Sequence, residues 1–199
     1  MAIKEIMEFV GAISTIVIAI QLGVMICTEK KNREETRRLQ TIRIMENWSS
    51  SLKKEASSAE TIVEHFDRKQ CRRLYKKKTI IVNRKTAKKI QEILPKHKIK
   101  GLDNPKKKKF KIKNALLLEF RWYVISYLNM LESVLTAWDL KIVDTEVIKN
   151  QFQYLYKPEK DWNVLEEFRQ AAGGNKVYPN IDKFINELKN GKTKKVKKL

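Results

Sequence analysis

The sequence predicts an all-α protein in which an N-terminal transmembrane helix continues into a long helix, followed by a cytosolic helical bundle. Three observations support this fold class. An uncharged stretch of 19 residues lies near the N-terminus. No glycine or proline occurs between Gly23 and Pro95, so nothing in that segment interrupts a helix. Apolar residues recur every three or four positions through most of the remaining chain, which is the helical period.

The uncharged stretch, Phe9 to Cys27, is long enough to cross a bilayer. At about 1.5 Å per residue it spans roughly 28 Å, close to the thickness of the hydrocarbon layer. A cleaved signal peptide would need a basic start and a small-residue cleavage site, but Lys4 is accompanied by Glu5 and Glu8 and no clear cleavage site follows. A buried core helix is the other alternative. We expect a retained membrane anchor that comprises residues 1–28.

The charges that flank the span predict its orientation. One lysine precedes it, whereas five basic residues follow it closely: Lys30, Lys31, Arg33, Arg37 and Arg38. Positive charge stays on the cytoplasmic side of a membrane. The sequence therefore predicts a single-pass protein of the inner (cytoplasmic) membrane, with its N-terminus outside and its C-terminal domain in the cytosol.

The span carries two distinctive rows of side chains around its circumference. Small residues that allow another helix to pack closely recur every four positions: Gly11, Thr15, Ala19 and Gly23. Polar residues that are costly in hydrocarbon recur every seven positions on another side: Ser14, Gln21 and Thr28. We expect the helices to self-associate into a homo-oligomer with Ser14 and Gln21 facing a central axis, which would begin a pore. The alternative is a lone anchor with scattered polar residues.

Residues 29–94 are predicted to form a long membrane-proximal helix followed by a short helix. The long helix carries an apolar stripe: Ile42, Met45, Trp48, Leu52, Ala56, Ala59, Val63 and Phe66. It is expected to break between residues 76 and 83, where β-branched side chains follow three lysines. The short helix, residues 84–94, should end at Pro95.

The chain is strongly basic. It contains 43 lysines and arginines against 23 acidic residues, a formal charge of +20, which favours an anionic partner such as a phospholipid surface or a nucleic acid. The densest run is Lys106, Lys107, Lys108 and Lys109, within a predicted basic loop at residues 95–114. These lysines are candidates for anion binding, and a merely solvated loop is an equal alternative.

Residues 115–190 are predicted to form the helical bundle, and residues 191–199 a basic disordered tail. Residues 115–140 are apolar almost all round and should be the central helix. Further helices are expected at residues 145–156, 159–172 and 180–188. Asp144 should cap the first of these, and Gly173 and Gly174 should end the second.

The central helix also carries polar residues that need partners if they are buried. Asn129 and Glu132 lie three apart on one face, and Arg121 and Arg169 are the expected partners in a buried polar network. Neither His65 nor His97 lies at metal-ligand or nuclease spacing from a second catalytic group, and the two cysteines have no metal-type spacing. No catalytic residue, metal site or cofactor is expected, and a nuclease-like helical domain is the remaining enzymatic alternative.

Several segments resemble a family of bacterial membrane-anchored helical proteins of unknown function. They are RWYVISYLNMLESVLTAWDLKIVD, with its Tyr127-Leu128-Asn129 and Glu132 element, the acidic helix start at Asp144, and VLEEFRQAAGG, with Phe168 and Arg169. The layout is also similar to the accessory transmembrane protein of type VI-B CRISPR loci. That resemblance implies a degenerate HEPN-like nuclease fold, assembly into a membrane pore, and phage defence through membrane depolarisation.

Two functions follow from the sequence. The first is a homo-oligomeric membrane effector, in the form of a pore, whose cytosolic domain senses a partner. The second is a membrane-tethered binding module for RNA or a protein–RNA complex. The expected partners are accordingly the lipid bilayer, further copies of the chain, and RNA or an effector protein complex.

Overall fold

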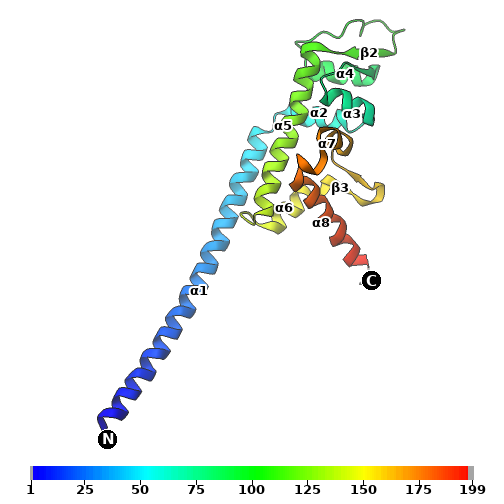
Figure 1. Ribbon diagram of the computed structural model, residues 1–199. Coiled ribbons are helices and arrows are strands. Elements are labelled where there is room, and N and C mark those ends of the chain that lie inside the picture. The colour runs from blue at the N-terminus through cyan, green and yellow to red at the C-terminus, as the bar shows by residue number, and fades with distance from the viewer. Residues whose placement is uncertain (1, 197–199) are drawn as a thin grey trace.

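The computed structural model describes the backbone of residues 2–196 and the side chains of residues 20–190. The protein is mostly helical, as predicted, and strands are confined within the described residues to four short segments. A long helix, α1, leads to a domain in which the other helices gather around α5 (Figure 1).

Helix α1 (Ala2–Ser51) is 50 residues long, about 75 Å at the usual rise per residue. Its residues 20–39 are all exposed, so this part of the helix stands away from the domain. The prediction of an unbroken helix to about residue 76 is wrong. The chain turns at Leu52 and Lys53, and α2 (Lys54–Val63) starts in a new direction that packs Ala56, Ala59, Ile62 and Val63 into the core.

The turn between α2 and α3 is marked in the sequence by a helix-capping motif, which the apolar stripe obscured. Helix α3 (Arg68–Tyr75) begins with a capping box, in which the Asp67 side chain accepts a hydrogen bond from the Gln70 backbone and the Gln70 side chain accepts one from the Asp67 backbone. Such reciprocal bonds satisfy two donors that a helix start leaves unpaired. The Asp-x-x-Gln spacing therefore explains why the helix restarts here.

The far half of α1 packs antiparallel to α5 (Asn114–Asp139). The Trp48 ring meets the rings of Tyr127 at 5.8 Å and Phe152 at 5.2 Å, both edge-on. Thr41, only 4% exposed, accepts a hydrogen bond of 2.7 Å from the Asp144 backbone N–H. These contacts attach the long helix to the domain.

Helix α5 is the centre of the core, as predicted, and ten of its side chains are buried. Around it lie α4 (Arg84–Ile93), α6 (Thr145–Phe152), α7 (Glu166–Ala172) and α8 (Pro179–Val196). Asp144 caps α6 through hydrogen bonds to two backbone N–H groups, and Gly173, with φ of 120°, ends α7. The start of α6 at Asp144 and the end of α7 at Gly173 both agree with the sequence prediction.

The predicted helix at residues 159–172 is wrong in its first half. Strand β3 (Tyr156–Lys157) pairs with β4 (Trp162–Asn163), and short 3₁₀ turns at Gln153–Leu155 and Pro158–Lys160 surround β3. Asp161 adopts φ of 41°, which reverses the chain into β4. A third 3₁₀ turn, Gly174–Lys176, precedes α8. Helix α8 extends to Val196, into the segment predicted as a disordered tail, and residues 197–199 lie outside the described residues.

The segment predicted as a basic loop contains a strand. Strand β2 (Lys109–Ile112) pairs antiparallel with β1 (Ile80–Asn83), placing Ile80 opposite Ile112 and Val82 opposite Phe110. All four of these side chains are buried, whereas Lys109 and Lys111 are exposed. Apolar and basic residues alternate with the period of a strand, and the lysine content hid that alternation in the sequence.

Within the part of the chain that the structure describes, no helix combines the length and the apolarity needed to cross a membrane. The predicted span, Phe9 to Cys27, lies largely outside those residues, because side chains are described only from Ile20 onward.

The packing of Trp48 predicts that replacing it destabilises the protein much more than replacing the exposed Trp122. We expect Trp48→Ala to lower the free energy of unfolding by about 3 kcal/mol or more, because it removes a ring packed between two others. Trp122→Ala, whose ring is 52% exposed, should change it by less than about 1 kcal/mol. Chemical denaturation of both variants checks this, and equal losses would contradict the docking of α1.

Candidate nucleic-acid interface

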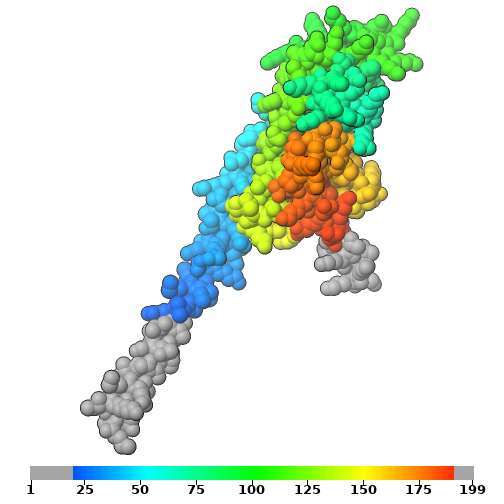
Figure 2. All heavy atoms as spheres, viewed as in Figure 1, coloured from blue at the N-terminus to red at the C-terminus, as the bar shows by residue number. Residues whose placement is uncertain are grey.

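The positive charge of the chain is concentrated in one segment. Residues 68–113 contain 20 lysines and arginines and two acidic residues, Glu92 and Asp103, which gives this segment a formal charge of +18 out of +20 for the whole chain. Figures 1 and 2 place it, in teal and green, at the end of the molecule opposite the start of α1. We call this end, residues 68–113, the basic lobe.

The basic lobe contains a hollow of about 640 Å³, which we call the lysine groove. It lies between the segment after α4, strand β2 and the first turn of α5. No acidic side chain lines it, and seven exposed lysines do: Lys96, Lys98, Lys100, Lys107, Lys109, Lys111 and Lys113. Such a hollow focuses a positive potential and attracts anions.

Arg84, at the start of α4, fixes the chain that forms one side of the groove. Its guanidinium donates hydrogen bonds to three backbone carbonyls, those of Leu102 at 2.7 Å, Lys107 at 2.9 Å and Asn104. It also lies 5.4 Å from the centre of the Phe110 ring. One side chain thereby holds the loop against both α4 and β2.

Further polar contacts fix the segment that follows α4. The Gln91 side chain accepts a hydrogen bond of 2.8 Å from the Ile99 backbone N–H. His97 Nε2 lies 2.7 Å from Glu119 Oε2 on α5. At Gly101, φ of 78° turns the chain in a conformation that glycine adopts without strain. The groove is therefore built from an ordered loop.

The four lysines singled out in the sequence are all exposed, but only some of them belong to the groove. Lys107 and Lys109 line it, and Lys106 and Lys108 do not. Lys107 donates a hydrogen bond of 2.9 Å to the Lys100 carbonyl. The remaining groove lysines were missed, although they follow every second position in two runs, residues 96–100 and 109–113. That alternation was the signal for a shared face.

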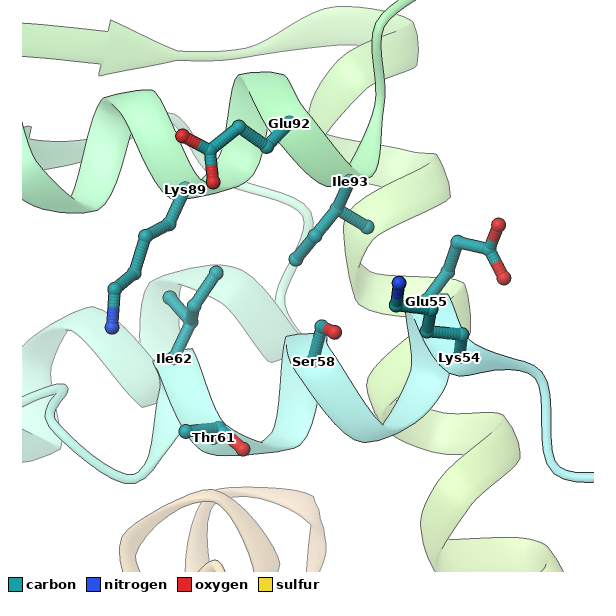
Figure 3. Close-up of a pocket in the computed structure, with 8 residues that line it drawn as sticks. All are labelled: Lys54, Glu55, Ser58, Thr61, Ile62, Lys89, Glu92 and Ile93. Carbon is teal, nitrogen blue, oxygen red and sulfur yellow. The ribbon is translucent and has the colours of Figure 1, made fainter.

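A second hollow, between α2 and α4, has a different character. Figure 3 shows Lys89, Glu92 and Ile93 of α4 above the facing turns of α2. It measures about 510 Å³, and its two lysines are balanced by Glu55 and Glu92. Because its charges cancel, it does not concentrate a positive potential, and the lysine groove is the stronger candidate for an anion site.

The predicted buried polar network divides into separate sites. The Glu132 carboxylate accepts hydrogen bonds from the Asn180 backbone at 2.9 Å, the Asn180 side chain at 2.8 Å and the Ile181 backbone at 3.1 Å. It therefore caps the first turn of α8, where a negative charge is favourable. Glu132 has a positioning role and no link to Asn129, whose side chain is exposed.

The two arginines of that prediction also have different partners from those expected. Arg169 is 1% exposed and donates to the Val164 carbonyl at 2.9 Å, to the Asn163 side chain and to Asp182 of α8. Arg121 donates to the Tyr75 carbonyl at 2.9 Å. Of the four residues in the predicted network, only Glu132 and Arg169 contact the same element, the start of α8.

Glu64 is a polar residue that the sequence did not single out. Its carboxylate accepts a hydrogen bond from the backbone N–H of Leu165, which adopts φ of 46°. Burial raises the pKa of this carboxyl from 4.5 to about 7, although the Leu165 hydrogen bond lowers it. Glu64 thus holds the strained start of α7, and the neighbouring Glu166 carboxylate accepts from Asn163 at 2.7 Å.

The predicted residues of the span are only partly described. The side chains of Ser14, Thr15 and Ala19, and the surroundings of Gly11, lie outside the described residues. Gln21 and Thr28 are exposed, and Thr28 Oγ1 donates to the Val24 carbonyl at 2.9 Å. A Cβ added at Gly23 would meet nothing within 4 Å, so that position is open to a neighbour.

No family model matches the chain, and no curated protein or solved structure is significantly similar to it.

The raised pKa of Glu64 predicts how stability depends on pH. A carboxyl with a higher pKa in the folded state binds more protons there, so its contribution to stability is lost as pH rises from about 4.5 to about 7. We expect Glu64→Gln to weaken this decline, because the amide oxygen still accepts from Leu165 but does not ionise. The free energy of unfolding of the wild type and of Glu64→Gln is measured at pH 5, 6, 7 and 8. An identical decline with pH in both proteins would contradict the raised pKa of Glu64.

The contacts of Arg84 predict a local effect of its removal. We expect Arg84→Ala to lower the free energy of unfolding by about 2 kcal/mol or more, because it deletes charged hydrogen bonds. Faster hydrogen exchange should appear at the turn amides of Leu102, Asn104 and Lys107. Lys85→Ala, an exposed neighbour, is the matched control and should leave exchange unchanged.

Proposed function

We propose that this chain is a membrane-tethered module that binds RNA through its lysine groove. The observation that carries the proposal is the groove itself, in which seven exposed lysines converge without an acidic side chain. Lysine ammonium groups act as point charges that bind phosphate. Such contacts bind the nucleic-acid backbone and confer no sequence preference.

The position of the groove favours nucleic acid over lipid. If residues 9–27 cross the bilayer, the 24 residues from Thr28 to Ser51 extend about 36 Å beyond it. The basic lobe lies past that end of α1 (Figure 1). Attraction to headgroups falls off over a Debye length of about 8 Å, and even a helix tilt of about 40° leaves a larger separation. A cytosolic polyanion is then the available partner, and unpaired cytosolic strands are mostly RNA.

The proposal predicts salt-sensitive binding that depends on specific lysines. We expect the double variant Lys109→Gln/Lys111→Gln to bind RNA more weakly. It should reduce the slope of log K against log[salt] by about 1.4, since each contact with a single-strand phosphate contributes about 0.7. Fluorescence anisotropy with a labelled 12-nucleotide RNA at 50 to 300 mM salt measures both quantities.

Two controls make this test specific. Lys160→Gln/Lys176→Gln removes the same charge from exposed positions outside the basic lobe and should leave binding nearly unchanged. The second control measures binding of the full chain, held in detergent-free nanodiscs, to vesicles that contain anionic lipids. Binding to vesicles but not to RNA at 50 mM salt would reject the proposal.

A second candidate, a homo-oligomeric membrane pore, is favoured by a different observation. Residues 20–39 of α1 are all exposed, and they include the apolar side chains of Ile20, Leu22, Val24, Met25 and Ile26. Apolar side chains on an isolated helix require lipid or another helix around them. With the small-residue row and Gln21, this supports an assembly of several α1 helices, and the resemblance noted above adds phage defence by membrane depolarisation.

The mass of the detergent-solubilised particle tests the second candidate. A pore predicts a discrete multiple of 23.5 kDa and a loss of membrane potential on activation. Gln21→Leu should keep the mass and abolish the current, because it removes the polar group from the axis. A strictly monomeric particle, or unchanged current in that variant, would reject the pore.

A further inference from the structure

We infer that Trp122 stacks on an unpaired base of the strand whose phosphates lie in the lysine groove, so that the site selects single strands. The inference rests on the proposed function and names its ligand more closely. Trp122 projects from the first half of α5 and remains 52% exposed, an unusual state for so large an apolar ring. Stacking on aromatic rings is a common way for proteins to bind unpaired bases.

The ring is held in place on one side. Lys53 Nζ lies 5.6 Å from its centre, and the neighbouring Tyr123 ring meets it edge-on at 5.1 Å. These groups border a hollow of about 300 Å³ that also includes Ser126 and Asn129. A fixed, partly exposed ring beside an open hollow is suited to receive a flat ligand.

Helix geometry connects this hollow to the lysine groove. Ala115 lines the groove, and Leu118 and Trp122 follow it three and seven residues later, on the same face of α5. Seven residues correspond to about 10 Å along the helix. Leu118, which lies between the two sites, is itself 47% exposed. A strand bound in the groove can therefore reach Trp122 within a few nucleotides.

The hollow also offers hydrogen-bonding groups to the edge of a base. Asn129 and Ser126 line it, and neither side chain forms a hydrogen bond with another described residue. An amide presents both donors and an acceptor. This accounts for the exposed position of Asn129, which the sequence suggested would be buried.

Charge decides against a simple apolar partner for this face. Lys53 borders the hollow and seven lysines line the groove, while the Glu119 carboxylate between them is paired with His97. An occupant must therefore combine a flat apolar surface with negative charge. A single-stranded nucleic acid has both properties. A duplex has the charge, but its bases are stacked on one another and paired, and their faces are not available to Trp122.

The test compares a 12-nucleotide RNA strand with its blunt duplex, using the full chain in detergent. We expect Trp122→Leu to weaken single-strand binding by about 5- to 150-fold, the usual range for loss of one stacking contact, and to leave duplex binding unchanged. Trp122→Phe should retain most of the affinity. Leu140→Ala, which alters another exposed apolar residue, at 63%, is the matched control and should bind as the wild type does.

The outcomes separate this inference from the proposed function. If Trp122→Leu binds the single strand normally while Lys109→Gln/Lys111→Gln does not, the groove binds RNA and the stacking inference is wrong. If no variant or wild-type protein binds either RNA, the proposed function fails first. A lower particle mass for Trp122→Leu would show that a second copy covers the ring, which also overturns the inference.

Discussion

The basic lobe depends on one guanidinium that gathers backbone carbonyls. Seven lysines around one hollow repel one another, and that repulsion opposes the folded loop. Arg84 offsets it by donating to the carbonyls of Leu102, Asn104 and Lys107. A cation is suited to this task because carbonyl oxygens carry partial negative charge and one planar group can bond several of them. The lysines are therefore held close together, and a phosphate in the groove would relieve their repulsion.

The rest of the domain uses buried charge in a similar way, to position elements. Glu132 binds backbone N–H groups at the start of α8, and Arg169 joins Asp182 of the same helix to the β4 region. Arg169 is buried and Glu132 is half-buried, and each has several partners, which offset the cost of desolvation. Glu64 does the same for the start of α7. These contacts converge on the first turns of α7 and α8.

The sequence was informative where a local signal was strong and misleading where the tertiary context decided. The apolar circumference of residues 115–140, the cap at Asp144 and the glycine at 173 each specified an element. The turn at Leu52 contains no glycine or proline that would mark it in the sequence. Its position is set by the packing of α2 against α5, which the periodicity of apolar residues cannot reveal. The pairing of β1 with β2 joins residues about 30 apart, and the lysine groove exists only once that pairing has formed. A run of lysines predicted anion binding, but the pairing determined which lysines share a face.

The same packing also links the groove to the long helix. The hollow beside Trp122 is lined by Ser51, the last residue of α1, and by Lys53 in the turn that follows. One turn before Ser51, Trp48 lies against Tyr127 of α5. A base on Trp122 would thus contact α5 and the end of α1 at once, and it would favour the conformation in which both are docked. Residues 20–39 of α1 are all exposed, so the docked segment from Thr41 to Ser51 is the route through which a ligand could bias an assembly of α1 helices. If both proposals hold, RNA binding and oligomer formation would be compatible in one chain and coupled at the turn between α1 and α2.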